Sequence, residues 1–133
     1  MKRIIALALV IVCILALSAC NQKENEDILH LGINAEIVEI DTDNQMVYVV
    51  DFGEEKVFGA RCGIDCKQLI VDQEILYVDY DTEEVSLIQF ADLAVGDKVT
   101  INAYESQLSS ITDGVIEVEQ IQLATQRLHA DYR

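Results

Sequence analysis

The chain lacks proline entirely, has only 6 glycines and 2 histidines, and carries 9 basic residues against 24 acidic ones. The absence of proline excludes collagen-like, proline-rich and mucin-like proteins. A formal net charge of −15 argues against nucleic-acid binding, because neutralising phosphates requires a basic surface. With so few histidines and no glycine-rich loop, the sequence contains no catalytic triad, phosphate-binding loop or dinucleotide fingerprint, and we expect a protein that is not an enzyme.

The residues that are present indicate a small globular protein. A length of 133 residues allows one domain and hardly two. A hydrophobic fraction of 51% is too high for a chain that is disordered throughout. The sequence therefore predicts one folded domain with an acidic surface.

Residues 1–20 have the composition of a secretory signal. Two basic residues precede an unbroken apolar run over residues 4–17, which is shorter than a membrane span and typical of a signal peptide. The run ends in Leu17-Ser18-Ala19-Cys20, which resembles the lipobox of bacterial lipoproteins. An ordinary signal peptide and an uncleaved membrane anchor are the alternative interpretations.

This resemblance implies that the Cys20 thiol receives a diacylglycerol, with palmitate as a typical acyl chain, and that cleavage occurs just before it. The protein would then be anchored in the membrane on the extracytoplasmic face of the bacterial envelope. Removing residues 1–19 also removes two basic residues, so the charge becomes −15 − 2 = −17. We expect a flexible tether over residues 20–30, a domain over 31–124 and a tail over 125–133.

The body of the chain has the pattern of β-strands separated by acidic turns. We predict five or six antiparallel strands and no helix, with residues 59–68 irregular and a short return to pairing over 56–58. The apolar phase slips by one residue at Ile37–Val38, which predicts a β-bulge. The expected strands are Ile33–Ile40, Met46–Phe52, Glu74–Tyr80, Val85–Phe90, Lys98–Tyr104 and Val115–Leu123.

Repeated bends in a small all-β chain favour closure into a barrel, which removes exposed strand edges. Residues 92–101, with the sequence DLAVGDKVTI, resemble a segment that recurs in OB-like barrels of small secreted bacterial proteins. The resemblance implies that Leu93 and Val95 lie in the barrel floor and that Gly96 reverses the chain into the next strand. It implies a fold and no activity.

Cys62 and Cys66 are the most pointed candidates for chemistry. Outside the cytoplasm, two cysteines four residues apart in a helical turn lie within the distance that a disulfide spans. We therefore consider a structural disulfide, a redox-active pair of a thiol-disulfide protein, and two reduced thiols. A zinc site would need four ligands, and His30 and His129 are the only further candidates, both expected on the surface.

Acidic residues cluster at the two predicted hairpin turns, with Asp41 and Asp43 at the first and Asp81 and Glu83 at the second. If both turns lie at one end of the barrel, their carboxylates can converge on Ca²⁺. The alternative is a solvated acidic rim that keeps the domain soluble. The series Asp41-x-Asp43 does not continue as an EF-hand loop.

The sequence thus predicts a lipid-anchored, non-enzymatic binding or accessory module whose partner is an envelope protein or a glycan. Tyrosines that fall in predicted strands would form a stacking platform for a glycan if they shared one outer face. More often, such tyrosines are half-buried strand residues whose hydroxyls face water. A Ca²⁺-binding module and a thiol redox protein are the competing hypotheses.

Overall fold

This computed structural model describes residues 26–128. The predicted signal peptide, Cys20 and His129 lie outside the described residues. The helices are α2 (Lys67–Asp72) and α3 (Glu105–Leu108), and the 3₁₀ turns are η2 (Phe90–Asp92) and η3 (Ser109–Asp113). The strands are β1 (Leu29–Asp41), β2 (Met46–Asp51), β3 (Cys62–Asp65), β4 (Ile75–Val78), β5 (Val85–Leu87), β6 (Lys98–Tyr104), β7 (Val115–Ile116) and β8 (Gln120–Leu123).

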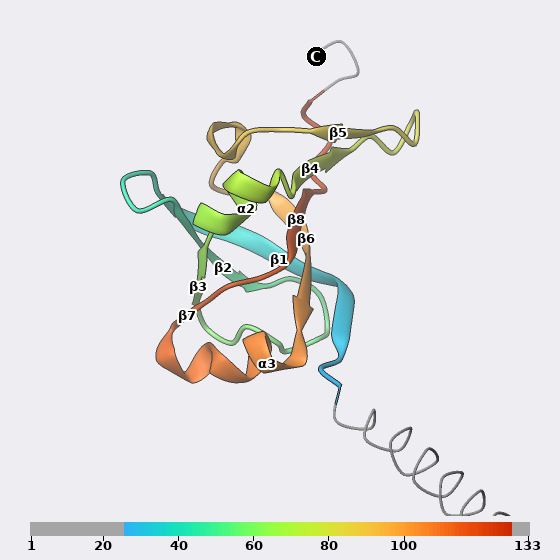
Figure 1. Cartoon of the computed structure of the whole chain (residues 1–133). Helices are drawn as coiled ribbons and strands as arrows, with labels where there is room; N and C mark the ends of the chain where they lie inside the picture. The colour runs from blue at the N-terminus through green and yellow to red at the C-terminus, as the bar shows by residue number, and fades with distance from the viewer. Residues whose placement is uncertain (1–25, 129–133) are drawn as a thin grey trace, which may run out of the picture.

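Within residues 26–128, all eight strands belong to one mixed sheet in the order β5-β4-β8-β6-β1-β2-β3-β7 (Figure 1). The expected all-β class is confirmed, but the sheet is not a closed barrel, because its ladder of pairs ends at β5 and at β7. The number of strands also exceeds the expected five or six. One reason is that the single strand predicted over 115–123 is interrupted at residues 117–119 and forms two strands, β7 and β8.

The bulge predicted in β1 is present. Ile37 pairs with Val49 and Glu39 pairs with Tyr48, so Val38 is the extra residue. The turn before β6 bonds to the chain at this point: the Ile37 amide donates to the Asp97 carbonyl at 2.9 Å, and the Gly96 amide donates to the Ile37 carbonyl at 2.8 Å. The bulge therefore fixes the point at which the chain enters β6.

The DLAVGDKVTI segment behaves as the resemblance implies in two of three respects. Leu93 is buried, and Gly96 has a φ of +93°, which only glycine adopts without strain. Val95, expected in the barrel floor, is instead 63% exposed. The Asp97 carboxylate closes this turn by accepting the Ala94 amide at 2.8 Å, which leaves Val95 at its tip.

The core is formed by the inward-facing side chains of the strands, which alternate along each strand with outward-facing ones. The inward side chains of β1, β2 and β6 are fully or almost fully buried, while their neighbours in sequence face outward. The most deeply buried side chains include Ile37, Val47, Val49, Phe58, Ile64, Ile75, Val99, Ile101, Ile121 and Leu123.

Two elements lie in the region that was expected to be irregular, namely β3 and the start of α2. Conversely, residues 56–58, expected to resume pairing, form no strand. There the Asp51 carboxylate accepts the amides of Val57, Phe58 and Gly59 at 2.8, 2.7 and 2.9 Å. The partly buried Asp51 carboxylate therefore holds this loop in place of strand pairing.

The described part of the predicted tail packs against the domain. Leu128 is buried, and its carbonyl accepts a hydrogen bond from the Tyr77 hydroxyl. The Arg127 guanidinium binds the Asp97 carboxylate with two hydrogen bonds, at 3.0 and 2.8 Å. No helix within residues 26–128 is long and apolar enough to cross a membrane.

Candidate functional site

An apolar groove of about 550 Å³ runs between α2 on one side and the β5–η2 segment on the other, with the start of β4 as its floor. We call it the α2–η2 groove. Its volume falls in the range of small-ligand sites. The lining residues are seven apolar side chains and three glutamines: Leu69, Ile70, Ile75, Leu87, Ile88, Phe90, Ala91, Gln45, Gln73 and Gln89.

The α2 side of the groove is built by a short helix with defined ends. The Asp65 carboxylate accepts the Lys67 amide at 3.0 Å at the start of the helix, and Gln73 ends it in a left-handed conformation with a φ of 58°. Apolar residues at helical spacing turn toward the body of the domain, so that Leu69 is buried and Ile70 is half-buried against the core. Gln73 and Ile70 thus both reach the groove from the last turn.

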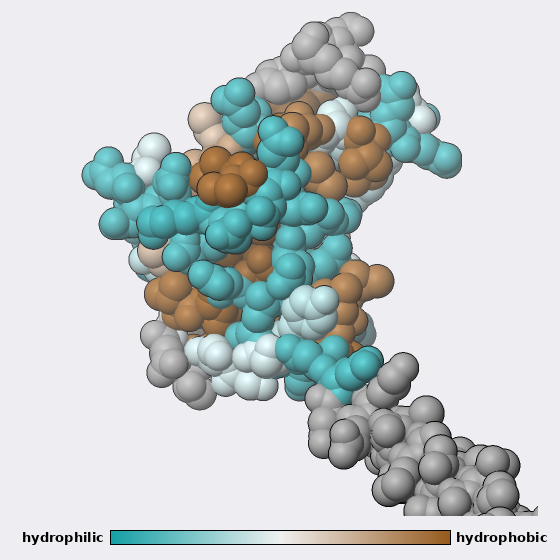
Figure 2. All heavy atoms as spheres, in the orientation of Figure 1, coloured by the Kyte–Doolittle hydropathy of each residue, from teal (hydrophilic) through white to brown (hydrophobic). Residues whose placement is uncertain are grey.

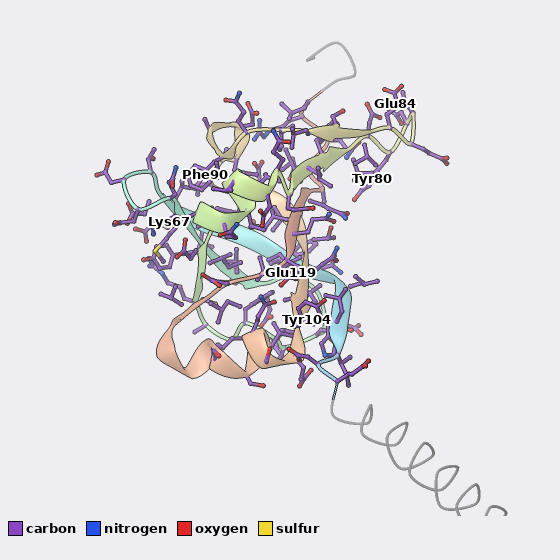
Figure 3. All side chains as sticks on the ribbon, viewed as in Figure 1. Lys67, Tyr80, Glu84, Phe90, Tyr104 and Glu119 are labelled. Carbon is purple, nitrogen blue, oxygen red and sulfur yellow. The ribbon has the colours of Figure 1, made fainter. Side chains whose placement is uncertain are left out.

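The opposite side is held by the turn that follows β5. The Gln89 amide donates to the Asp92 carboxylate at 2.8 Å, and the Asp92 amide donates to the Gln89 carbonyl at 2.9 Å. This reciprocal capping fixes the position of Phe90, which lies beside α2 in Figure 3. Ile88, just before the turn, is buried and closes the inner end of this wall.

No ionisable side chain lines the groove, although the stretch of chain that builds it is strongly acidic. Residues 68–97 contain β4, β5, η2 and all of α2 except its first residue, Lys67, and they include no lysine, arginine or histidine. An apolar interior with an acidic surround distinguishes this site from an ordinary acidic surface. The carboxylates of this stretch are those of Asp72, Glu74, Asp79, Asp81, Glu83, Glu84, Asp92 and Asp97.

The cysteine pair does not have the expected geometry. Cys62 begins β3 and Cys66 follows its last residue, so the backbone between them is extended rather than helical. Four residues of extended chain span about 13 Å, beyond the ~7 Å limit for a disulfide. Both thiols are free and fully buried, and the expected disulfide between them is absent because of this strand.

The environment of the two thiols also disfavours redox chemistry. Burial raises the pKa of Cys62 to about 11, with a further contribution from the negative charge of Asp51. Burial, followed by the charge of Asp65, raises the pKa of Cys66 to about 12. Because the thiolate is the reactive form, burial disfavours reaction of these thiols at neutral pH, and both side chains pack in the core.

The acidic turns do not converge on a metal ion. The turn with Asp41 and Asp43 and the turn with Asp81 and Glu83 project from opposite sides of the molecule (Figure 1). Among residues 26–128, no group of three potential metal ligands is close enough to hold an ion. The expected Ca²⁺ site is therefore wrong, because the second hairpin extends away from the first.

The turn carboxylates instead organise their own turns. Asp41 accepts hydrogen bonds from the backbone and side chain of Asn44 at 3.2 and 2.8 Å, and the side-chain bond is the main cause of the lowered pKa of Asp41. Asp79 accepts the amides of Asp81 and Thr82 at 2.9 and 3.2 Å. These bonds are typical of Asx turns.

The strand tyrosines do not form a common platform. Tyr77 is buried, Tyr80 is exposed beside the β4–β5 turn, and Tyr104 lies at the start of α3 at the other end of the molecule (Figure 3). The Tyr48 ring is covered by the Arg61 guanidinium, which lies 4.3 Å from its centroid. His30, expected on the surface, lies there partly exposed and pairs with Glu105.

A second hollow, of about 510 Å³, lies between the α3–η3 segment and β7. Its side chains are mainly polar and include the carboxylates of Asp65 and Glu117. Asp65 is already used, because it bonds to the Lys67 amide and pairs with the Lys67 ammonium at 3.6 Å. This hollow has no apolar interior, which makes the α2–η2 groove the better candidate.

Scans against protein-family models, curated proteins and solved structures found no match to this chain. The candidate site therefore depends on the geometry of the chain itself. The groove was not predicted from the sequence, although the sequence contains two signals of it. Apolar residues at helical spacing occur at Cys66, Leu69 and Ile70, and a capping pair is formed by Gln89 and Asp92.

Proposed function

We propose that this protein is a membrane-anchored lipoprotein of the bacterial envelope whose folded domain is a non-enzymatic binding module. The lipid anchor would be attached to Cys20 of the lipobox, and the domain would bind an apolar group of an envelope partner in the α2–η2 groove. The observation that carries this proposal is a groove without ionisable side chains in a domain of high negative charge. Exposed apolar openings of this size mark places where a ligand or a partner binds, and no titratable group lines this one to perform acid–base chemistry.

An OB-like architecture is part of the proposal. Supporting it, β1, β2 and β3 form an antiparallel meander, β3 pairs in parallel with β7, and β8 pairs with β6, which returns to β1. β7 and β8 are successive segments of one stretch of chain. Between them, the Glu119 amide donates to the Asn102 carbonyl of β6 at 2.8 Å, which keeps the stretch close to the sheet.

The groove is tested by methyl NMR on the full chain in phosphatidylcholine nanodiscs, with isoleucine δ1 methyls labelled. The probe is N-acetyl-leucine-N-methylamide, a neutral mimic of an apolar residue. We expect saturable shifts at Ile70, Ile75 and Ile88, and none at Ile33 or Ile101 in the main core. Uniform or non-saturable shifts would contradict binding in the groove.

A matched pair of variants sharpens this test. Ala91→Trp places an indole in the groove from an exposed position, and Ala60→Trp makes the same change on a distant exposed loop. Binding of the probe should be lost in the first variant and retained in the second. Equal binding by the two variants would show that the probe binds elsewhere.

The anchor is tested by labelling cells with radioactive palmitate and isolating the protein. Incorporation should be lost in Cys20→Ala and kept in Cys13→Ala, since Cys13 lies in the segment that cleavage removes. Membrane fractionation of the same strains should show release of the Cys20→Ala protein from tight membrane association. Label that persists in Cys20→Ala would exclude this site of lipidation.

A further inference from the structure

The outer edge of β5 is open, and the register shows which of its backbone groups face outward. β5 is the last strand of the sheet, and among residues 26–128 no strand pairs with its free side. On the β4 side, the Asp79 amide donates to the Glu84 carbonyl at 2.9 Å and the Ile88 amide to the Ile75 carbonyl at 3.0 Å.

Hydrogen-bonded and non-hydrogen-bonded pairs alternate along an antiparallel ladder. The two bonds to Glu84 and Ile88 therefore place the Tyr77–Ser86 pair in the hydrogen-bonded class and leave Val85 and Leu87 in the other class. The N–H and C=O groups of Val85 and Leu87 consequently point away from β4, toward the open edge. These are the groups that an added strand would bond.

The same two residues expose apolar side chains. Val85 is 59% exposed and Leu87 is 53% exposed, and both lie on one face of the strand because they are two residues apart. Figure 2 shows hydrophobic side chains at the surface over α2 and over the β4–β5 hairpin, where hydrophilic ones separate them. An edge that combines free backbone groups with apolar side chains is suited to strand addition.

The open edge is continuous with the α2–η2 groove. Leu87 belongs to both, and the groove then follows the chain through Ile88 to Ala91. A peptide strand bonded along β5 would therefore extend toward the groove opening. One of its side chains can enter the groove while its backbone pairs with β5.

The negative charge around this surface favours a partner of positive charge. Residues 68–97 carry eight carboxylates and no basic side chain. The Arg127 guanidinium binds Asp97 of this stretch, and Lys67, at the start of α2, pairs with Asp65 just before it. A partner strand with lysine or arginine side chains is complementary to this surface, whereas an acidic strand is repelled.

We propose that β5 and the α2–η2 groove together bind an extended, cationic polypeptide segment. The segment adds a strand to the sheet and inserts an apolar side chain into the groove. This inference rests on the proposed function of the groove as a binding site. The main-chain bonds to Val85 and Leu87 would supply affinity. The groove and the acidic surround would supply specificity.

The probe is a capped heptapeptide of alternating lysine and valine, titrated onto the full chain in phosphatidylcholine nanodiscs, with empty nanodiscs as the background. Fluorescence anisotropy measures affinity, and hydrogen exchange measures protection of single amides. Exchange should slow at least tenfold at Val85 and Leu87 and stay unchanged at Ser86, whose amide is already paired with β4. N-methylation of the peptide amides that face the protein should weaken binding at least tenfold, and replacing its lysines by glutamates should abolish it.

Protein variants examine the same contact from the other side. Val85→Lys places a positive charge on the open edge, and Val115→Lys makes the same change at an exposed valine of β7, at the opposite end of the sheet and outside residues 68–97. The first should weaken peptide binding at least tenfold, and the second should leave it unchanged. Val85→Pro removes one outward N–H, and if that variant fails to fold, the N-methylated peptide removes the matching partner groups without altering the protein.

The outcomes separate this inference from the proposed function. If N-acetyl-leucine-N-methylamide binds the groove but the heptapeptide does not bind, strand addition is wrong and the binding module stands. If the heptapeptide binds without protecting Val85 and Leu87, or binds equally when N-methylated, strand addition is also wrong. Protection of these amides that rises with protein concentration in the absence of peptide would identify a second copy of this chain as the occupant and overturn the cationic partner. If neither probe binds, both proposals fail.

Discussion

The region around β1, β2 and β6 and the region formed by residues 68–97 differ in how their charged side chains are paired. On the outer face of β1, β2 and β6, Glu36 pairs with Lys98 and Glu39 pairs with Arg61. Over residues 68–97, by contrast, the chain carries eight carboxylates and no basic residue of its own. In the first region these charges are paired with each other, whereas the second region has an excess of negative charge even with Arg127 bound to Asp97.

Polar side chains follow the same division. On the outer face of β6 and β8, Asn102 donates to Gln120 at 3.0 Å, and Thr100 donates to Gln122 at 3.2 Å. Large apolar side chains are exposed in both regions, at Leu31 and Val38 of β1 and at Val71, Val85 and Leu87 around α2 and β5. The two regions therefore differ in the pairing of their charged and polar groups, and it is the excess of negative charge around β5 that favours a cationic partner there.

The largest expected difference between the regions is in stability. Ile101→Ala removes a fully buried side chain from β6 and should lower the free energy of unfolding by about 2–5 kcal/mol. Leu87→Ala removes a side chain that is half in water and should change it by no more than about 0.5 kcal/mol. Urea denaturation of the two variants measures both values. Similar midpoints would contradict the assignment of β5 as a binding edge outside the core.

A second comparison concerns two carboxylates that accept backbone amides. Asp51→Ala leaves three amides of the 57–59 loop without an acceptor, one of them on the buried Phe58, and should cost about 2–3 kcal/mol. Asp79→Ala releases two turn amides that water can reach more easily, so we expect a loss of about 1 kcal/mol. Thermal unfolding gives the order, and hydrogen exchange at Val57 and Gly59 should accelerate only in Asp51→Ala.

Much of the region around β1, β2 and β6, where charged side chains pair with each other, could be predicted from the sequence. Alternation located β6, turn residues located the first hairpin, and the phase slip at Ile37–Val38 located the bulge. These features depend on neighbours in the chain, which a sequence displays directly. Strand β3 was missed because Cys62 and Cys66 suggested a helical turn and because four residues are too few to establish a period.

The candidate site could not be predicted in the same way. The α2–η2 groove combines Gln45, Leu69 and Phe90, which are brought together only by the path of the whole chain. The Ca²⁺ hypothesis failed for the same reason, since the directions of two hairpins depend on the connections between them. The charge asymmetry of residues 68–97, however, is visible in the sequence, and it is the property that assigns a sign to the partner.

The buried thiols of β3 make stability depend on pH in the alkaline range. Their pKa values are raised in the folded state, to about 11 for Cys62 and about 12 for Cys66, so the folded protein retains protons that the unfolded chain loses above pH 9. Stability is therefore fully present below pH 9 and falls as pH rises toward 11, by roughly 1 kcal/mol per thiol at pH 10.

The measurement is urea denaturation at pH 8 and pH 10 for the natural chain and for a variant with Cys62→Ala and Cys66→Ala. The variant should be less stable at pH 8 because it loses buried volume, but its further loss at pH 10 should be smaller. Tyr77, whose pKa is also raised by burial, is common to both proteins and cancels in the difference. Parallel pH dependences would show that the thiols do not titrate in this way.

The smallest expected effect is on the free energy of unfolding when one carboxylate is neutralised, and its sign should differ between the two regions. Glu36→Gln removes the partner of Lys98 and should lower stability by a few tenths of a kcal/mol, since the lysine keeps its contact with the Phe52 ring, 4.8 Å from the centroid. Glu83→Gln removes one of several neighbouring carboxylates and should raise stability by a similar amount, because it relieves repulsion within the acidic stretch. Salt screens both effects, so the two variants should converge on the natural chain at about 0.5 M salt, where the Debye length is below about 5 Å. If both substitutions had the same sign at low salt, the paired face and the acidic stretch would not differ electrostatically, and the argument for a cationic partner would lose its basis.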